Sequence, residues 1–170
     1  MTFKMLKSNN IDIRAKIEGS GPLIVLVHGC PESWYSWRHQ IPLLSEKDYT
    51  VAAIDVRGYG GSSKPYEIKA YSMRELTNDV IGVIDALGFE KAILMGRDWG
   101  GPIVWNTAAL NETRISAVLG LSVPFSQGEK FQLLISLEKY IRASFSISSI
   151  FKKKALLNKS LKQIYENIWS

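Results

Sequence analysis

The chain has 170 residues, of which 46% are hydrophobic and 22% charged, so it is long enough to bury one sizeable core. No stretch approaches the roughly 18 apolar residues that a membrane-spanning helix needs, and the N-terminus lacks the apolar core of a signal peptide. A single cysteine, Cys30, excludes an internal disulfide framework, and together these features predict a cytoplasmic protein.

The net charge of +5 is unevenly distributed. Acidic and basic side chains balance over residues 1–124, so the whole excess lies in residues 125–170. A basic segment can bind nucleic acid or anionic lipid, but it is more often the solvated face of a helix. We therefore expect no nucleic acid among the partners of this chain and no membrane span.

The first predicted elements form a β-hairpin. Residues 3–6 and 11–17 flank the polar turn Ser8-Asn9-Asn10, and apolar residues alternate with polar ones in the second segment. Residues 23–27 then form an unbroken apolar run, which is typical of a strand buried on both faces of a parallel sheet.

Helices and strands alternate along the following residues. The sequence predicts a short helix over 34–44, a buried strand over 50–54 and a loop rich in glycine and serine over 55–65. Ser72-Met73-Arg74-Glu75 is typical of a capping box, and the helix that it opens ends at Gly88.

The last predicted elements of the sheet surround a glycine-rich turn. A strand over 91–95 leads into Gly96-Arg97-Asp98-Trp99-Gly100-Gly101, a helix runs from there to about Leu110, and a further strand covers 116–121. The order of elements predicts an α/β fold whose open, mostly parallel sheet has about six strands and flanking helices.

Polar side chains follow the ends of three predicted strands. They are His28, Asp55 and Asp98. Ligands of open α/β sheets bind beyond the carboxyl ends of the strands, so we expect these three side chains to face one crevice. The alternation stops after the last strand, so we expect residues 1–125 to form the sheet core and the basic residues 126–170 to form a separate helical segment.

The turn around Asp98 has the pattern of a nucleophile elbow, with aspartate at the nucleophile position. A strand that turns at once into a helix strains the central residue, and a side chain at Gly96 or Gly100 would collide with the elbow or with the neighbouring strand. The helix N-terminus favours a negative charge at Asp98. The alternative is an ordinary glycine-rich turn with a capping aspartate.

Four motifs in register resemble the epoxide hydrolases of the α/β-hydrolase fold, over residues 5–126. They are His28-Gly29-Cys30-Pro31 with the following residues 32–38, the loop 55–65, the elbow 96–101 with residues 102–105, and residues 120–125. The resemblance implies the N-terminal part of an α/β-hydrolase core, followed from residue 126 by the beginning of a helical cap domain.

The same resemblance implies a mechanism. Asp98 would attack an epoxide carbon to form an alkyl-enzyme ester, which water would hydrolyse to a diol. The backbone N–H groups of Cys30 and Trp99 would form the oxyanion hole, and the Trp99 ring would line the pocket. The residues implied to shape the site are His28, Gly29, Pro31, Gly96, Gly100 and Gly101. The expected substrate is a small apolar or aromatic epoxide, with no cofactor and no metal.

The sequence departs from the family pattern in two respects. Arg97 stands where the family usually has histidine, beside the nucleophile. The family's catalytic histidine follows the elbow, but the only histidines here, His28 and His39, precede it. The family cap also supplies two tyrosines that protonate the epoxide oxygen, and Tyr140 and Tyr165 match no such pattern.

These departures lead to the expectation of an N-terminal half of an epoxide hydrolase: a truncated reading frame, a fragment or a pseudogene product. Its last strand would then leave an uncovered apolar edge. A haloalkane or haloacid dehalogenase, which also uses an aspartate elbow, is one alternative. A second alternative is a non-catalytic module derived from a hydrolase. A third is a half that pairs with another chain carrying the missing base.

Overall fold

The computed structural model describes residues 2–122. The expected cap segment 126–170, with Tyr140 and Tyr165, lies outside the described residues. The elements are, in chain order, β1 (Thr2–Ser8), β2 (Ile11–Glu18), β3 (Leu23–Val27), η1 (Trp34–Trp37), α1 (Gln40–Ser45), β4 (Thr50–Ile54), η2 (Ile68–Tyr71), α2 (Met73–Ala86), β5 (Ala92–Arg97), α3 (Gly100–Leu110), η3 (Glu112–Arg114) and β6 (Ile115–Leu121). No helix among residues 2–122 is long and apolar enough to cross a membrane.

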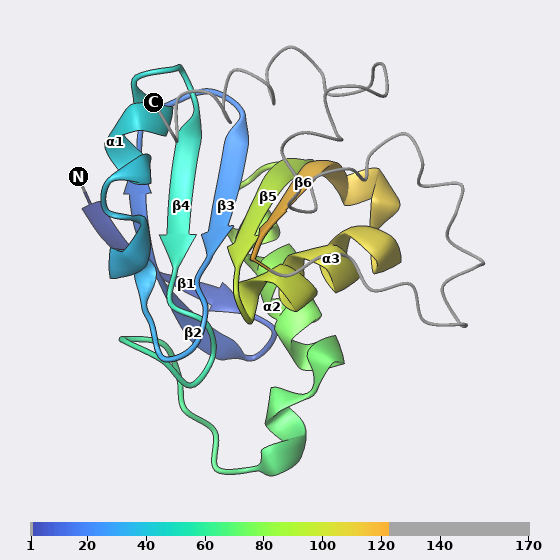
Figure 1. Ribbon diagram of the computed structural model, residues 1–170. Helices are drawn as coiled ribbons and strands as arrows, with labels where there is room; N and C mark the ends of the chain where they lie inside the picture. Colours follow the sequence, from blue (N-terminus) through green and yellow to red (C-terminus); the bar gives the residue numbers. More distant parts are fainter. Residues whose placement is uncertain (1, 123–170) are drawn as a thin grey trace.

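The strands form one six-stranded mixed sheet in the order β1-β2-β4-β3-β5-β6 (Figure 1). β2 pairs antiparallel with β1 and with β4, and the other neighbouring strands pair in parallel. The sheet confirms the α/β-hydrolase fold that the sequence predicts. The hairpin is confirmed as well: Asn9 and Asn10 take left-handed φ angles of 47° and 61°, which asparagine tolerates in a two-residue turn.

Helices cover both faces of the sheet, and the alternation of side chains along β3 divides the core. Val25 and Val27 belong to one apolar cluster, together with side chains of α2 and α3. Ile24 and Leu26 belong to a second cluster, together with side chains of η1 and α1. All of β3 is buried for this reason, which explains why its sequence is apolar at every position.

The continuous helix predicted over 34–44 is wrong. The structure has instead the short 3-10 helix η1, Trp34–Trp37, and then α1, which begins at Gln40. A continuous helix would place Pro42 in its interior, where proline has no N–H to donate and its ring clashes with the carbonyl four residues earlier. In α1 Pro42 lies in the first turn, where that N–H has no partner within the helix.

The capping box predicted at the start of α2 is only half formed. Ser72 Oγ accepts a hydrogen bond from the Glu75 N–H at 3.4 Å. The Glu75 carboxylate does not return to Ser72 but accepts a hydrogen bond from the Asn9 side chain at 2.7 Å. The end of the helix is as predicted, because Gly88 has a left-handed φ of 78° and donates to the carbonyl of Asp85.

β6 is an edge strand of the described sheet, as expected for the last strand. In the described part of the chain β6 has a strand neighbour only on the β5 side. Its apolar side chains are nevertheless buried, because Val118 belongs to one cluster of the core and Leu119 and Leu121 to the other.

Candidate active site

The elbow lies between β5 and α3, and its central residue has a strained backbone. Asp98 has a φ of 52°, in the left-handed region that residues other than glycine, asparagine and aspartate rarely adopt. A Cβ added at Gly96 would lie 2.2 Å from the carbonyl oxygen of Gly100. A Cβ added at Gly100 would lie 2.2 Å from the carbonyl oxygen of Val27 on the neighbouring strand. Neither glycine position accommodates a side chain.

The Asp98 carboxylate accepts hydrogen bonds from two backbone N–H groups. Cys30 N–H donates to Oδ1 at 3.0 Å, and the N–H of Trp99 is the second donor. These two bonds, with a smaller contribution from the nearby Arg97 guanidinium, lower the pKa of Asp98 below its ordinary value. Asp98 is therefore an ionised, oriented carboxylate at neutral pH.

The loop after β3 approaches the elbow closely because it contains Gly29. A Cβ at this position would lie 2.6 Å from Cβ of Asp98 and 2.7 Å from its Oδ1. Any other residue would push the loop away from the carboxylate. The following Cys30–Pro31 peptide is cis, and the Cys30 side chain is exposed.

His28 is buried behind this loop. Its Nε2 accepts a hydrogen bond from the Val56 N–H at 2.9 Å, and its Nδ1 lies 2.7 Å from the carbonyl oxygen of Gly29. These partners assign the proton to Nδ1 in a neutral ring. Burial lowers the pKa of His28. Because both ring nitrogens have backbone partners, His28 shapes the turn and has no nitrogen free to take a proton from water.

Asp55 does not face the elbow, so the expectation of one crevice shared by His28, Asp55 and Asp98 is wrong. Both His28 and Asp55 are fully buried. The Asp55 carboxylate accepts hydrogen bonds from the Arg14 side chain at 2.7 Å and from the backbone N–H groups of Trp34 and Gly61, each at 2.9 Å. It stabilises the loops around the site and takes no direct part in it.

Tyr59 is a neighbour of the site that the sequence did not indicate. Its hydroxyl donates to Sγ of Cys30 at 3.2 Å, and its ring packs edge-on against His28 with the ring centroids 5.3 Å apart. The hydrogen bond with Cys30, together with burial, raises the pKa of Tyr59. Tyr59 belongs to a glycine-rich loop without periodicity, so no local pattern places it here.

Glu32 and Arg97 form an ion pair beside the elbow. Nη1 of Arg97 lies 2.9 Å from Oε1 of Glu32. The other carboxylate oxygen of Glu32 accepts the N–H of Gly29 at 3.2 Å. The departure from the family pattern at Arg97 was the only signal of this contact in the sequence.

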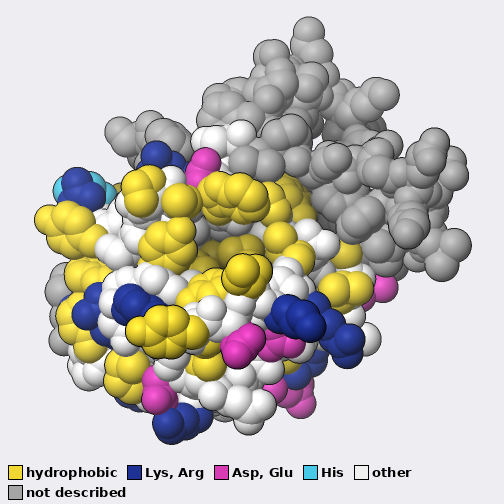
Figure 2. All heavy atoms as spheres, turned by 90° about the horizontal axis from the view of Figure 1, so that it is seen from below, with side chains coloured by type: hydrophobic (Ala, Val, Ile, Leu, Met, Phe, Trp, Pro, Cys, Tyr) yellow, Lys and Arg dark blue, Asp and Glu magenta, His cyan; other side chains and the backbone are white. Residues whose placement is uncertain are grey.

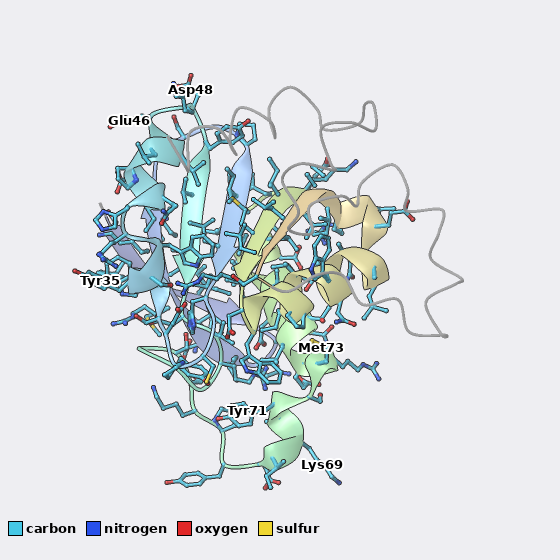
Figure 3. The ribbon with its side chains drawn as sticks, in the orientation of Figure 1. Tyr35, Glu46, Asp48, Lys69, Tyr71 and Met73 are labelled. Carbon is cyan, nitrogen blue, oxygen red and sulfur yellow. The ribbon has the colours of Figure 1, made fainter. Side chains whose placement is uncertain are left out.

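The end of the sheet that carries the elbow presents exposed apolar side chains. Figure 2 looks onto this end and shows hydrophobic side chains gathered across it. The Trp99 side chain is 63% exposed there. Figure 3 shows Lys69 and Tyr71 on the segment that projects beyond the strand ends, where Ile68 is also exposed.

Comparison with known proteins gives a consistent result. The profile of the alpha/beta hydrolase fold family matches residues 22–146. Epoxide hydrolase B of Mycobacterium tuberculosis is 57% identical over 106 residues, which are 62% of this chain and 30% of that protein. Epoxide hydrolase A of the same organism is 46% identical over 125 residues, 72% of this chain and 39% of that protein. This chain thus spans well under half the length of these curated relatives.

Comparison with solved structures also finds an epoxide hydrolase. The epoxide hydrolase from an endophytic Streptomyces superposes with a TM-score of 0.73 at 42% identity, over 80% of this chain and 42% of that one. The residues described above as the elbow and its facing loop lie inside the matched region of the family profile.

Proposed function

The chain belongs to the α/β-hydrolase fold family and is homologous to epoxide hydrolases, and from this premise we propose that Asp98 is a nucleophile that opens an epoxide. The single observation that carries the proposal is the Asp98 carboxylate, held at a strained strand-to-helix turn by the Cys30 N–H at 3.0 Å. A carboxylate that is ionised, oriented and partly exposed is suited to attack an alkyl carbon.

The proposed step is a displacement at one epoxide carbon. The free oxygen of the Asp98 carboxylate forms a bond to that carbon while the carbon–oxygen bond of the ring breaks. The ring oxygen leaves as an alkoxide and takes up a proton from solvent water, which yields a hydroxyalkyl ester of Asp98 and a hydroxide ion. Oδ1, which accepts the N–H of Cys30, becomes the ester carbonyl oxygen, so this donor, with the N–H of Trp99 beside it, would stabilise an oxyanion when water attacks the ester.

The hydrolytic half of the reaction needs a base that removes a proton from water. His28 is committed to its two backbone partners, and His39 is exposed at the N-cap of α1. We therefore assign only the first step, formation of the alkyl-enzyme ester, to Asp98 and its two N–H donors, Cys30 and Trp99. Complete turnover to a diol is proposed for an assembly that also supplies the base, from a further part of the protein or from a partner chain.

Intact-mass measurement after incubation with a small aromatic epoxide tests the proposal. We expect a covalent adduct of substrate mass, mapped to Asp98 in a peptide digest and released by hydroxylamine, as expected for an ester. Asp98→Asn keeps the shape of the side chain and should form no adduct. Asp12→Asn removes an exposed carboxylate on β2 and serves as the matched control that should still react.

Three other outcomes would contradict the proposal in whole or in part. An adduct on a different carboxylate, or an equal yield in Asp98→Asn, would overturn the nucleophile assignment. Diol formed over many turnovers without a lasting adduct would show that this chain itself supplies a base. Chloride release from a chlorinated alkane, with no reaction toward epoxides, would favour the dehalogenase alternative.

A further inference from the structure

Glu32 connects the two strand ends that meet at the site. One of its carboxylate oxygens accepts the N–H of Gly29 at 3.2 Å, in the loop after β3. The other carboxylate oxygen is paired with Arg97 at 2.9 Å, in the last position of β5. Gly29 directly precedes the donor Cys30, and Arg97 directly precedes Asp98. Glu32 therefore links Gly29, which precedes the N–H donor Cys30, to Arg97, which precedes the carboxylate of Asp98.

We propose that Arg97 is a positioning residue that acts through Glu32 to hold the Cys30 N–H over the Asp98 carboxylate. This inference rests on the proposed function of Asp98 and deepens it. Arg97 does not touch the reacting atoms, since its guanidinium is paired with Glu32 and its side chain is 49% exposed. Its role is to fix Glu32, which in turn fixes the amide adjacent to the donor.

The arrangement needs a carboxylate at position 32, because two acceptor oxygens must serve two donors at once. It also favours arginine over a single-point donor at position 97, since arginine offers several N–H groups in a fixed plane and stays charged at every relevant pH. A surface ion pair adds little stability by itself. The expected effect of removing it is therefore on the geometry of the site and not on folding.

The pKa of Asp98 in a Glu32 variant should change in one direction if Glu32 acts only through its charge, and in the other if Glu32 positions the Cys30 N–H. Among residues 2–122, the titratable groups around the Asp98 carboxylate are Arg97 at the end of β5, and Cys30 and Tyr59 on the facing loops. Removal of the negative Glu32 charge would, through charge alone, make Asp98 easier to ionise and lower its pKa. Loss of the Cys30 hydrogen bond would raise the pKa of Asp98. The sign of the change in a Glu32 variant thus separates the two explanations.

The test compares Arg97→Met, Glu32→Met and the double variant in single-turnover alkylation by a small aromatic epoxide. We expect each single variant to form the adduct about tenfold more slowly, and the double variant to be no slower than either, because both changes break the same link. Arg97→Lys, which keeps the charge but offers only a single-point donor, should recover part of the rate. Lys7→Met, which breaks an exposed ion pair with Asp12 on the β1–β2 hairpin, is the control and should react normally.

A second readout does not depend on reactivity. Carbon-13 NMR titration of the Asp98 carboxyl should show a raised pKa in both Arg97→Met and Glu32→Met. Additive rate losses, or a lowered pKa of Asp98 in Glu32→Met, would overturn the positioning role. If the unmodified chain forms no adduct at all, the proposed function fails, and the titration still decides whether Glu32 and Arg97 hold the donor in place.

Discussion

Cys30 and Asp98 are 68 positions apart in the chain, yet the backbone N–H of Cys30 donates to Oδ1 of Asp98 at 3.0 Å. The register of the sheet accounts for this contact. β3 and β5 pair in parallel with Val27 opposite Gly96, so the residues that follow the two strands emerge at the same level. The distance between donor and carboxylate is therefore set by rigid strands, and only the short loop after β3 has to adapt.

Gly29→Ala should damage the site without unfolding the protein. The added Cβ would meet the Asp98 side chain at 2.6 Å, so the loop or the carboxylate must move by a fraction of an ångström or more. A displacement of this size is expected to slow alkylation by about a hundredfold. Single-turnover mass measurements check the rate, and thermal unfolding checks the fold.

Gly88→Ala is the matched control for that substitution. Gly88 has a left-handed φ of 78°, and no atom lies within 4 Å of an added Cβ. Alanine there should cost about 1 kcal/mol of unfolding free energy through backbone strain and leave alkylation unchanged. Equal rate losses in the two variants would mean that Gly29 acts through general stability and not through the close approach to Asp98.

The backbone strain at Asp98 should be measurable as a difference in unfolding free energy between two variants that both lack the carboxylate. Asp98→Gly and Asp98→Ala both lack the carboxylate, but only glycine adopts the observed φ of 52° without steric cost. We expect the glycine variant to be more stable by about 1 kcal/mol in denaturant unfolding. If the alanine variant is as stable as the glycine variant, the elbow relaxes when the carboxylate is removed.

The stability of the chain should decrease in mild acid because His28 is buried and neutral. Burial lowers the pKa of His28, so below about pH 6.5 the unfolded chain binds a proton that the folded chain does not. The free energy of unfolding should fall with decreasing pH, by at most about 1.4 kcal/mol per pH unit from this group, until the folded pKa is reached.

Two histidine variants check this pH dependence by urea unfolding between pH 5 and pH 8, a range set by the ordinary titration of histidine. His28→Gln should be less stable throughout but should lack the part of the slope that belongs to His28. His39→Gln, in which an exposed side chain changes, should keep the full slope. If the unfolding free energy of His28→Gln depends on pH as steeply as that of the unmodified chain, groups other than His28 cause the loss of stability in acid.

Much of the fold was predictable because its signals are local. The unbroken apolar run of β3 and the glycines of the elbow each reflect a constraint that acts within a few residues. The break between η1 and α1 was missed although Pro42 marks it, because aromatic and apolar residues on both sides continue the helical pattern.

The surroundings of Asp98 were less predictable, because they depend on contacts between distant segments. Nothing near Glu32 in the chain indicates that it pairs with Arg97 on another strand. The position of Asp55 after a strand suggested a site residue, but its partner Arg14 comes from the hairpin and turns the carboxylate inward. Sequence patterns located the strand ends, and only the packed structure distinguishes the carboxylate that faces solvent from the one that is buried.

The loop that carries Tyr59 is anchored by a buried ion pair whose loss should be costly. Arg57 donates to both carboxylate oxygens of Asp79 on α2, at 2.8 Å and 2.6 Å, and to the carbonyl of Ala70 at 2.9 Å. The hydrogen bonds from Arg57 to Asp79 raise the pKa of Arg57, so the guanidinium keeps its charge. Asp79→Asn would leave that buried charge with only the carboxylate of Glu75, 3.8 Å away, as a counter-ion, and we expect a loss of about 3 kcal/mol in unfolding free energy.

Two further variants separate the cost of an unpaired charge from the worth of the pair. Arg57→Met combined with Asp79→Leu removes both charges and should recover much of the loss, because neither side chain then needs a polar partner. Asp12→Asn breaks the exposed pair with Lys7 and should change the unfolding free energy by less than about 1 kcal/mol. If the double variant is as unstable as Asp79→Asn alone, the hydrogen bonds of this pair contribute net stability beyond charge neutralisation, and the loop at Tyr59 depends on them directly.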